Sequence, residues 1–211
     1  MLFRSFVHTL LDGAMDDENV REKFLNKAAK SLDGLDILVK DLLTLSQMET
    51  GDIKMHQDRI DLRQITKEIF EQLENKASSR NVKMYLKAPQ GNIWVRADGQ
   101  RIGQVMTNLV ENAVKYGNEN GNVWVDFEED KNAWKVSIKD DGQGIASEHL
   151  NRIFERFYRV DKARSRSDGS SGLGLAIVKH ILQGHRTKIS VISNVGKGTT
   201  FSFKLEKFLV K

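Results

Sequence analysis

The most constraining feature of the sequence is a long apolar stripe that begins at Phe24 and ends at Leu45. Within it, apolar or small residues follow one another at alternating steps of four and three, as along one face of an α-helix. The members of this stripe are Phe24, Ala28, Ser31, Leu35, Leu38, Leu42 and Leu45, with Leu25, Leu32, Val39 and Leu43 widening it. A helix with such a wide apolar face must pack against other helices in water.

A shorter helix is predicted before this stripe. Its apolar positions are Phe3, Phe6, Leu10 and Ala14. The acidic residues 16–18 are suited to cap the N-terminus of the long helix, and Gly51 followed by Asp52 is suited to end it. Residues 1–52 are therefore expected to form a helical hairpin with a short first arm.

One short helix cannot cover the whole apolar stripe. Two copies of the hairpin would bury it in a four-helix bundle, so a homodimer through residues 1–52 is expected. A second interpretation stays open, in which the hairpin packs onto the second domain of its own chain.

The spacing of apolar residues changes after residue 60. Residues 60–77 again have helical spacing, and further helices are predicted at 100–114 and 173–182. Short alternating runs predict strands at 82–86, 93–95, 123–127, 134–138, 188–192 and 200–205. Without regular βαβ alternation, this order predicts an α+β fold over residues 60–208, a two-layer α/β sandwich with a mixed, mostly antiparallel sheet.

Composition excludes several classes of protein. The chain has 211 residues with no cysteine, which excludes a disulfide scaffold, a thiolate metal site and a cysteine nucleophile. It lacks the run of roughly 18 apolar residues that a membrane helix needs, so a soluble, cytoplasmic chain is expected. The net charge of +4 divides into −3 over residues 1–50 and +7 over the remainder. The second unit is therefore expected to meet an anion, whether nucleotide, nucleic acid or lipid headgroup.

Three motifs in the second unit could carry chemistry, and the first lies on the helix predicted at 100–114 and just beyond it. Asn108, Asn112, Lys115 and Tyr116 share one helix face. An Asn amide oxygen suits Mg²⁺, a lysine can neutralise phosphate charge, and a tyrosine ring can flank a base. A solvated helix face is the alternative interpretation.

The second motif follows the strand predicted at 134–138. Asp140 precedes Gly142, Gly144 and Ile145, so a carboxylate stands where two glycines let the backbone approach a flat ligand. The same residue types are also common in turns.

The third motif is a glycine-rich segment that opens the helix predicted at 173–182. Gly169, Gly172 and Gly174 could bring backbone N–H groups against phosphates, although the pattern is neither a Walker loop nor a dinucleotide-binding fingerprint. A run of cationic and aromatic residues over 152–166 precedes it, and such a run could also bind nucleic acid.

In this order the three motifs resemble the ATP-binding domain of sensor histidine kinases. The resemblance covers about residues 60–206 and includes the aromatic segment 154–159 and the closing residues 196–201, and residues 41–51 are similar to the end of that family's dimerisation hairpin. It implies ATP and Mg²⁺ as cofactors, and it gives the basic run a role without nucleic acid.

Carried over by position, the resemblance makes Asn112 the Mg²⁺ ligand and places Asn108 and Lys115 beside the phosphates. Arg159 would reach the γ-phosphate, so that Asn108, Lys115 and Arg159 form the catalytic set. Asp140 would accept a hydrogen bond from the adenine amino group, and Tyr116 would flank the ring. The remaining implied ATP contacts are Gly142, Gly144, Ile145, Gly172, Leu173, Gly174 and Thr199.

The family transfers the γ-phosphoryl group of ATP to a histidine on the first bundle helix, and then to a response regulator. That histidine precedes an acidic residue and a proline, whereas His8 precedes Thr9 and the single proline is Pro89. The acceptor and any membrane segment are expected upstream, and this chain alone is not expected to phosphorylate itself. The alternatives are an ATPase of the same fold, with Glu111 activating water, and a non-catalytic interaction module.

Overall fold

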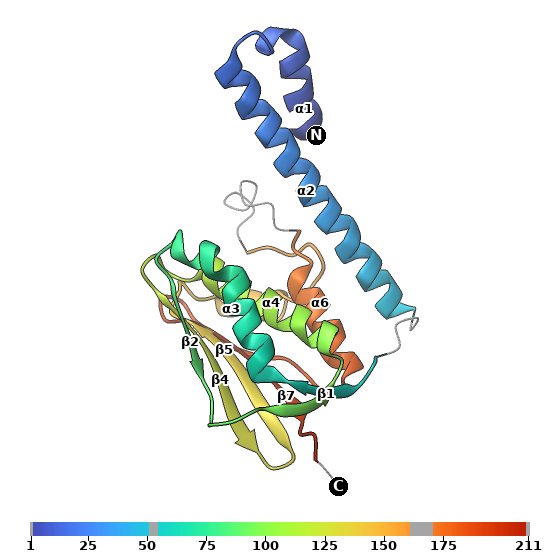
Figure 1. Ribbon diagram of the computed structural model, residues 1–211, viewed down its shortest axis with the longest axis vertical. Coiled ribbons are helices and arrows are strands. Elements are labelled where there is room, and N and C mark those ends of the chain that lie inside the picture. The colour runs from blue at the N-terminus through green and yellow to red at the C-terminus, as the bar shows by residue number, and fades with distance from the viewer. Residues whose placement is uncertain (1, 51–54, 161–170, 210–211) are drawn as a thin grey trace.

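The computed structural model describes residues 2–50, 55–160 and 171–209. It consists of a helical arm and a two-layer sandwich (Figure 1). Among the described residues, no helix is long and apolar enough to span a bilayer.

The arm contains α1 (Leu2–Thr9), a π-helical turn η1 (Leu10–Ala14) and α2 (Glu18–Glu49). The carboxylate of Asp17 caps α2 by accepting hydrogen bonds from the N–H groups of Asn19 (3.0 Å) and Val20 (3.3 Å), which confirms the predicted acidic cap. The rings of Phe6 and Phe24 lie 5.9 Å apart and join the two helices.

The apolar stripe of α2 has two environments within the single chain. Leu45 is 1% exposed and joins the core of the sandwich together with Leu42 and Met48, next to α6 (Gly174–Gly184). Further up the arm, Leu32 and Leu35 are each 50% exposed. Packing onto the chain's own second unit therefore accounts for the last turns of α2 and leaves much of the stripe uncovered.

The sandwich contains a five-stranded sheet in the order β2-β4-β5-β7-β6. β2 is parallel to β4, and the other neighbours are antiparallel. The strands are β2 (Lys83–Lys87), β4 (Asn122–Asp130), β5 (Ala133–Asp140), β6 (Ser190–Asn194) and β7 (Gly198–Glu206). The helices α3 (Leu62–Ser78), α4 (Gly99–Tyr116) and α6 cover one face (Figure 1). This confirms the predicted fold class.

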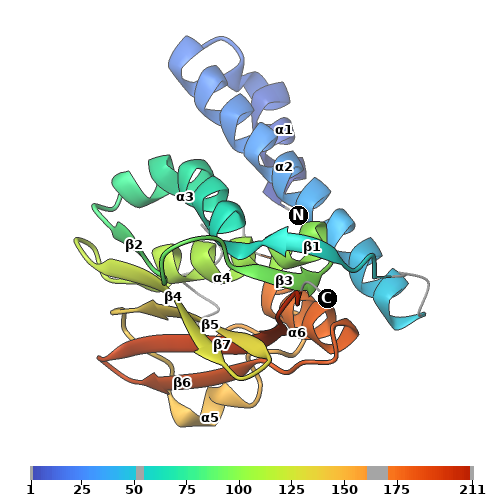
Figure 2. The same cartoon turned by 60° about the horizontal axis from the view of Figure 1, so that its bottom comes forward.

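Two further strands, β1 (Asp58–Asp61) and β3 (Trp94–Ala97), form a separate antiparallel ribbon. The ribbon lies beside the C-terminal end of β7 through a bridge between Val95 and Lys207, and Figure 2 shows it at the edge of the sandwich. A short helix, α5 (Ser147–Leu150), follows β5.

The start of the helix predicted at residue 60 is wrong. Residues up to Asp61 belong to β1, and α3 begins at Leu62. The Asp61 carboxylate explains the boundary, because it accepts hydrogen bonds from the N–H groups of Arg63 (3.0 Å) and Ile93 (2.9 Å). It thus caps α3 and ties the helix start to the segment before β3.

Candidate functional site

The helix α4 positions the first group of polar residues. Its apolar side, which includes Ile102, Val105, Met106 and Leu109, is fully buried in the core. Asn108, Asn112 and Lys115 are therefore half-buried beside the core, and Tyr116 is exposed at the last turn of the helix. The ammonium nitrogen of Lys115 lies 5.4 Å from the centre of the Tyr116 ring.

A buried carboxylate lies at the end of β5. Asp140 is 6% exposed, and its Oδ1 accepts hydrogen bonds from the N–H groups of Gly142 (2.9 Å) and Thr199 (3.2 Å). Burial raises the pKa of the Asp140 carboxyl, and the two backbone donors offset part of that rise. Because a carboxylate has about four acceptor positions, Asp140 can accept a further hydrogen bond from a ligand.

Two glycines fix the backbone that follows Asp140. A Cβ at Gly142 would lie 2.3 Å from the carbonyl oxygen of Tyr116, so the loop packs directly against the end of α4. Gly144 has φ +69°, and a Cβ there would lie 2.0 Å from the carbonyl oxygen of Asn194. The loop is thus held between α4 and β6 at positions that only glycine tolerates.

Ser193 also supports this loop, and the sequence interpretation missed it. Its hydroxyl accepts a hydrogen bond from the N–H of Ile145 (2.8 Å), lies 3.0 Å from the Gly198 carbonyl oxygen, and lies 2.9 Å from the Thr199 hydroxyl. Ser193 therefore joins the loop after β5 to the start of β7, where Thr199 contacts Asp140. An isolated serine in a strand gives no sequence signal for such a role.

Asp141 is a second missed residue. Its carboxylate accepts hydrogen bonds from the backbone N–H (2.9 Å) and the side-chain amide (2.9 Å) of Asn122. The carbonyl oxygen of Asp141 accepts a hydrogen bond from the side-chain amide of Asn118 (2.6 Å). Asp141 therefore binds the segment between α4 and β4.

The N-terminus of α6 forms the other end of the site. Leu173 is buried and makes no side-chain cap for this helix, so N–H groups of its first turn are suited to an anion. The Asn108 side-chain amide donates a hydrogen bond to the carbonyl oxygen of Gly174 (3.4 Å), which brings α4 against this end. The N–H of Phe157 donates to the carbonyl oxygen of Gly172 (3.0 Å).

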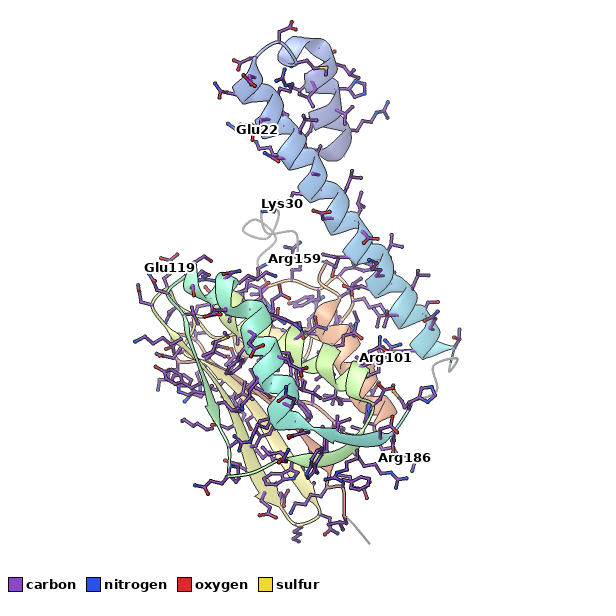
Figure 3. All side chains as sticks on the ribbon, viewed as in Figure 1. Glu22, Lys30, Arg101, Glu119, Arg159 and Arg186 are labelled. Carbon is purple, nitrogen blue, oxygen red and sulfur yellow. The ribbon has the colours of Figure 1, made fainter. Side chains whose placement is uncertain are left out.

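Arg159 lies at the same end of the sandwich. A Cβ at Gly172 would lie 3.4 Å from Cγ of Arg159, and Figure 3 places Arg159 at the end of the sandwich that faces the helical arm. The hydroxyl of Ser171 donates a hydrogen bond to the carboxylate of Asp41 on α2 (3.1 Å). Gly169 and the cationic residues beyond 160 in the basic run fall outside the described residues.

Together these residues make two chemically different ends. One end offers a buried carboxylate, an aromatic ring and close backbone. The other offers the Asn108 amide and Arg159 beside a helix N-terminus, while Lys115 lies next to the Tyr116 ring. Within the described residues, no three His, Cys, Asp or Glu side chains are grouped to hold a metal ion.

A family model described as "Histidine kinase-, DNA gyrase B-, and HSP90-like ATPase" matches residues 97–208. That match includes both ends of the site. The chain belongs to this ATPase family. This match confirms the resemblance to the ATP-binding domain of histidine kinases. The description of the family as ATPases implies that its members bind ATP.

Curated relatives of this ATPase-family chain are sensor kinases. The sensor histidine kinase WalK of Bacillus subtilis (strain 168) is 35% identical over 204 residues, and the alignment covers 96% of this chain and 33% of that protein. The sensor protein kinase WalK of Staphylococcus aureus is 34% identical over 205 residues, covering 95% of this chain and 48% of that protein. The chain thus spans between a third and a half of the length of these two relatives.

Solved structures share the fold. The Acinetobacter baumannii histidine kinase AdeS superposes with a TM-score of 0.78 at 24% identity, covering 98% of this chain and 94% of that one. The catalytic domain of histidine kinase ThkA covers 72% of this chain and 97% of its own, with a TM-score of 0.65 and 28% identity. A structure of ThkA in complex with the response regulator protein TrrA has a TM-score of 0.77 at 25% identity, covering 98% of this chain and 57% of that one.

Proposed function

We propose that this chain is the ATP-binding and dimerising portion of a sensor histidine kinase, with residues 60–208 as the nucleotide domain and residues 1–52 as the dimerisation hairpin. The observation that carries the proposal is the pairing of the buried Asp140 carboxylate with the Asn108 contact at the N-terminus of α6. A nucleotide needs an acceptor for its base and donors for its phosphates, and α4 borders both.

At the base end, Asp140 accepts a hydrogen bond from the adenine amino group, and Tyr116 flanks the ring. Gly142 and Gly144 keep the backbone close enough to enclose the base, and Thr199 holds the Asp140 carboxylate through its N–H. Ile145 completes the wall that Ser193 supports.

At the phosphate end, Asn112 would supply an amide oxygen to Mg²⁺, and Asn108 and Lys115 would border the phosphates. Because the described residues include no cluster of metal-binding side chains, the other ligands of Mg²⁺ would be phosphate oxygens and water, which is the usual way proteins hold this ion. Bound Mg²⁺ would neutralise phosphate charge. Arg159 contacts the γ-phosphate, and Gly172, Leu173 and Gly174 present the α6 N-terminus to the same groups.

The reaction of the whole protein would move the γ-phosphoryl group to a histidine on a dimerisation helix and then to a response regulator receiver domain. The complex of ThkA with TrrA supports that partner. We further propose that this portion acts in the cytoplasm, and no nucleic acid is proposed as a partner.

The five histidines of this chain are proposed not to accept phosphate. His149 lies 2.7 Å from the Tyr158 hydroxyl, and His185 bonds to the backbone of Ile181 and Asp98. His8 is exposed on α1 but lacks the acidic residue and proline of an acceptor. Incubation with γ-labelled ATP is expected to leave this chain unlabelled, and acid-labile, base-stable label on it would contradict the assignment.

Nucleotide binding is tested by calorimetry with ATP and Mg²⁺. Asn112→Ala is expected to weaken binding only when Mg²⁺ is present, because the residue acts through the ion. Asn132→Ala, an exposed asparagine of the β4–β5 turn, is the matched control and should bind normally. No heat at millimolar ATP, or equal affinity of Asn112→Ala and the unaltered chain with Mg²⁺, would refute the site.

Dimerisation is tested by sedimentation equilibrium. The exposed stripe of α2, including Leu32, Leu35 and Leu43, is proposed to be buried against a second copy. The chain should sediment as a dimer and Leu32→Asp as a monomer, while Ile192→Asp on the exposed side of β6 should remain dimeric. A monomeric unaltered chain would contradict this proposal.

A further inference from the structure

Arg80 lies outside every sequence motif and forms hydrogen bonds to the C-terminal end of α4. The guanidinium of Arg80 donates hydrogen bonds to the carbonyl oxygens of Val114 (3.1 Å), Lys115 and Gly117 (3.0 Å). Its own carbonyl oxygen accepts a hydrogen bond from the N–H of Asn120 (3.1 Å). Arg80 therefore joins the turn after α3 to both ends of the segment between α4 and β4.

The chemistry of this contact is specific to arginine. The last carbonyl groups of a helix have no partner within it and carry its negative dipole end. A planar guanidinium has five N–H donors and a permanent charge, so it can bond several carbonyl groups at once. A lysine ammonium at this position is a point charge on a flexible stem and would not hold three carbonyls in one arrangement.

The same carbonyl-bearing turn forms the wall behind the Asp140 loop. A Cβ at Gly142 would lie 2.3 Å from the Tyr116 carbonyl oxygen and 2.9 Å from Cα of Gly117. Since the N–H of Gly142 donates to Asp140, any displacement of the helix end would move the loop that orients this carboxylate. On the other side, Asp141 holds the same segment through Asn118 and Asn122.

We propose that Arg80 is a positioning residue of the nucleotide site, which sets the last turn of α4 so that Tyr116 and the Asp140 loop fit the base. The inference rests on the proposed ATP site. Arg80 acts through backbone carbonyls and does not itself contact nucleotide. Among the groups that Arg80 sets, Tyr116 and the Asp140 loop face the base, so its effect is shared by every ligand that carries adenine and does not require Mg²⁺.

The test compares Arg80→Lys and Arg80→Ala with Arg63→Ala. Arg63 is a matched control because it also donates to two loop carbonyls, those of Gly91 (2.6 Å) and Pro89, in a loop that has no part in the site. Calorimetry well below each melting temperature would give Kd for ATP, ADP and adenosine, and urea unfolding would give the stability of each variant. Amide hydrogen exchange of Gly117 and Gly142 would report the local geometry.

Both Arg80 variants are expected to weaken the binding of all three ligands by a similar factor, about tenfold by analogy with the loss of residues that orient metal ligands, with faster exchange at Gly117 and Gly142. Arg63→Ala should lose stability and keep its affinity. If Arg80→Ala does not fold, Arg80→Lys decides the question.

Unaltered affinity in the Arg80 variants, or an equal loss of affinity in Arg63→Ala, would overturn the role of Arg80 alone. Absence of any nucleotide binding by the unaltered chain would overturn the proposed function itself.

Discussion

Replacing Asp140 with asparagine is expected to weaken ATP binding while raising the stability of the folded chain at pH 7. The carboxylate is buried at the end of β5, and its Oδ1 accepts hydrogen bonds from the N–H groups of Gly142 and Thr199. An asparagine carbonyl oxygen can accept both of these bonds, so the loop should keep its conformation. What the variant loses is the negative charge and the acceptor character of the second oxygen.

The loss of affinity can be estimated from that chemistry. A hydrogen bond to a charged group contributes about 1.5–3 kcal/mol, and about 1.4 kcal/mol corresponds to a factor of ten. Asp140→Asn should therefore weaken ATP binding by roughly 10- to 150-fold. The amide nitrogen of the variant would also face the adenine amino group as a second donor, which pushes the result toward the upper end.

The stability of the same variant should change in the opposite direction. Burial raises the pKa of Asp140 in the folded chain above its ordinary value of 3.8, so the folded state holds this proton more tightly than the unfolded state. The stabilising contribution of Asp140 is complete below its unfolded pKa and is lost as pH rises through the folded pKa. At pH 7 the variant should be more stable than the unaltered chain, and the difference should shrink on acidification.

The assays are calorimetry with ATP and urea unfolding at several pH values. Asp126→Asn, in the middle of β4 between the buried Val125 and Phe127, provides a control for the removal of a carboxylate from the sheet. An Asp140→Asn chain that binds ATP within about threefold of the unaltered chain would refute the base contact. Lower stability at pH 7 would refute the argument from burial.

Three further substitutions, two of them with a control variant, are tested by urea unfolding and calorimetry. Gly142→Ala should lower the free energy of unfolding by about 1–3 kcal/mol and weaken ATP binding, because its Cβ would meet backbone. Gly103→Ala in α4, where a Cβ would have open space, should raise the free energy of unfolding by about 0.5–1 kcal/mol, and equal effects of the two variants would contradict this. Leu45→Ala should lower the free energy of unfolding by about 2–5 kcal/mol, because it leaves a cavity in the core. The exposed Leu43 provides the control: if Leu43→Ala, measured at low chain concentration, lowers the free energy of unfolding as much, this prediction is contradicted. Glu111→Gln, which breaks an exposed pair with a lysine on α3 (2.6 Å), should change stability by less than about 1 kcal/mol and leave any ATP turnover unaltered; loss of turnover would revive the ATPase alternative.

The sequence predicted most of the sandwich because its strands have alternating apolar residues and its helices have regular spacing. It missed β1, since Asp58–Asp61 has only one apolar residue and gains strand geometry by pairing with β3. The sequence also could not predict which residues of the apolar stripe of α2 are buried within the chain and which are exposed. Leu35 and Leu45 occupy the same seam, and only the position of the sandwich buries one and exposes the other.

The candidate site was predictable where the chemistry lies in local motifs, as with Asn108, Asp140 and Gly174. The residues that hold those motifs in place could not be predicted from the sequence. Arg80 and Ser193 bond to backbone groups or hydroxyls contributed by other elements, and neither residue type nor spacing marks such contacts. The fold brings these partners together, and a single sequence has no pattern that reports it.

Because α2 is continuous, it can act as a lever: a small tilt at the sandwich becomes a larger displacement at the far end of the helix. Its 32 residues run without interruption from Glu18 to Glu49, past the buried Leu45, a span of about 48 Å at about 1.5 Å per residue. One degree of tilt at the sandwich would therefore move the far end by about 0.8 Å. Gly34, which has open space around it, has the lowest intrinsic helix propensity of the residues in this helix. Its replacement by alanine would stiffen the lever while leaving the nucleotide site untouched.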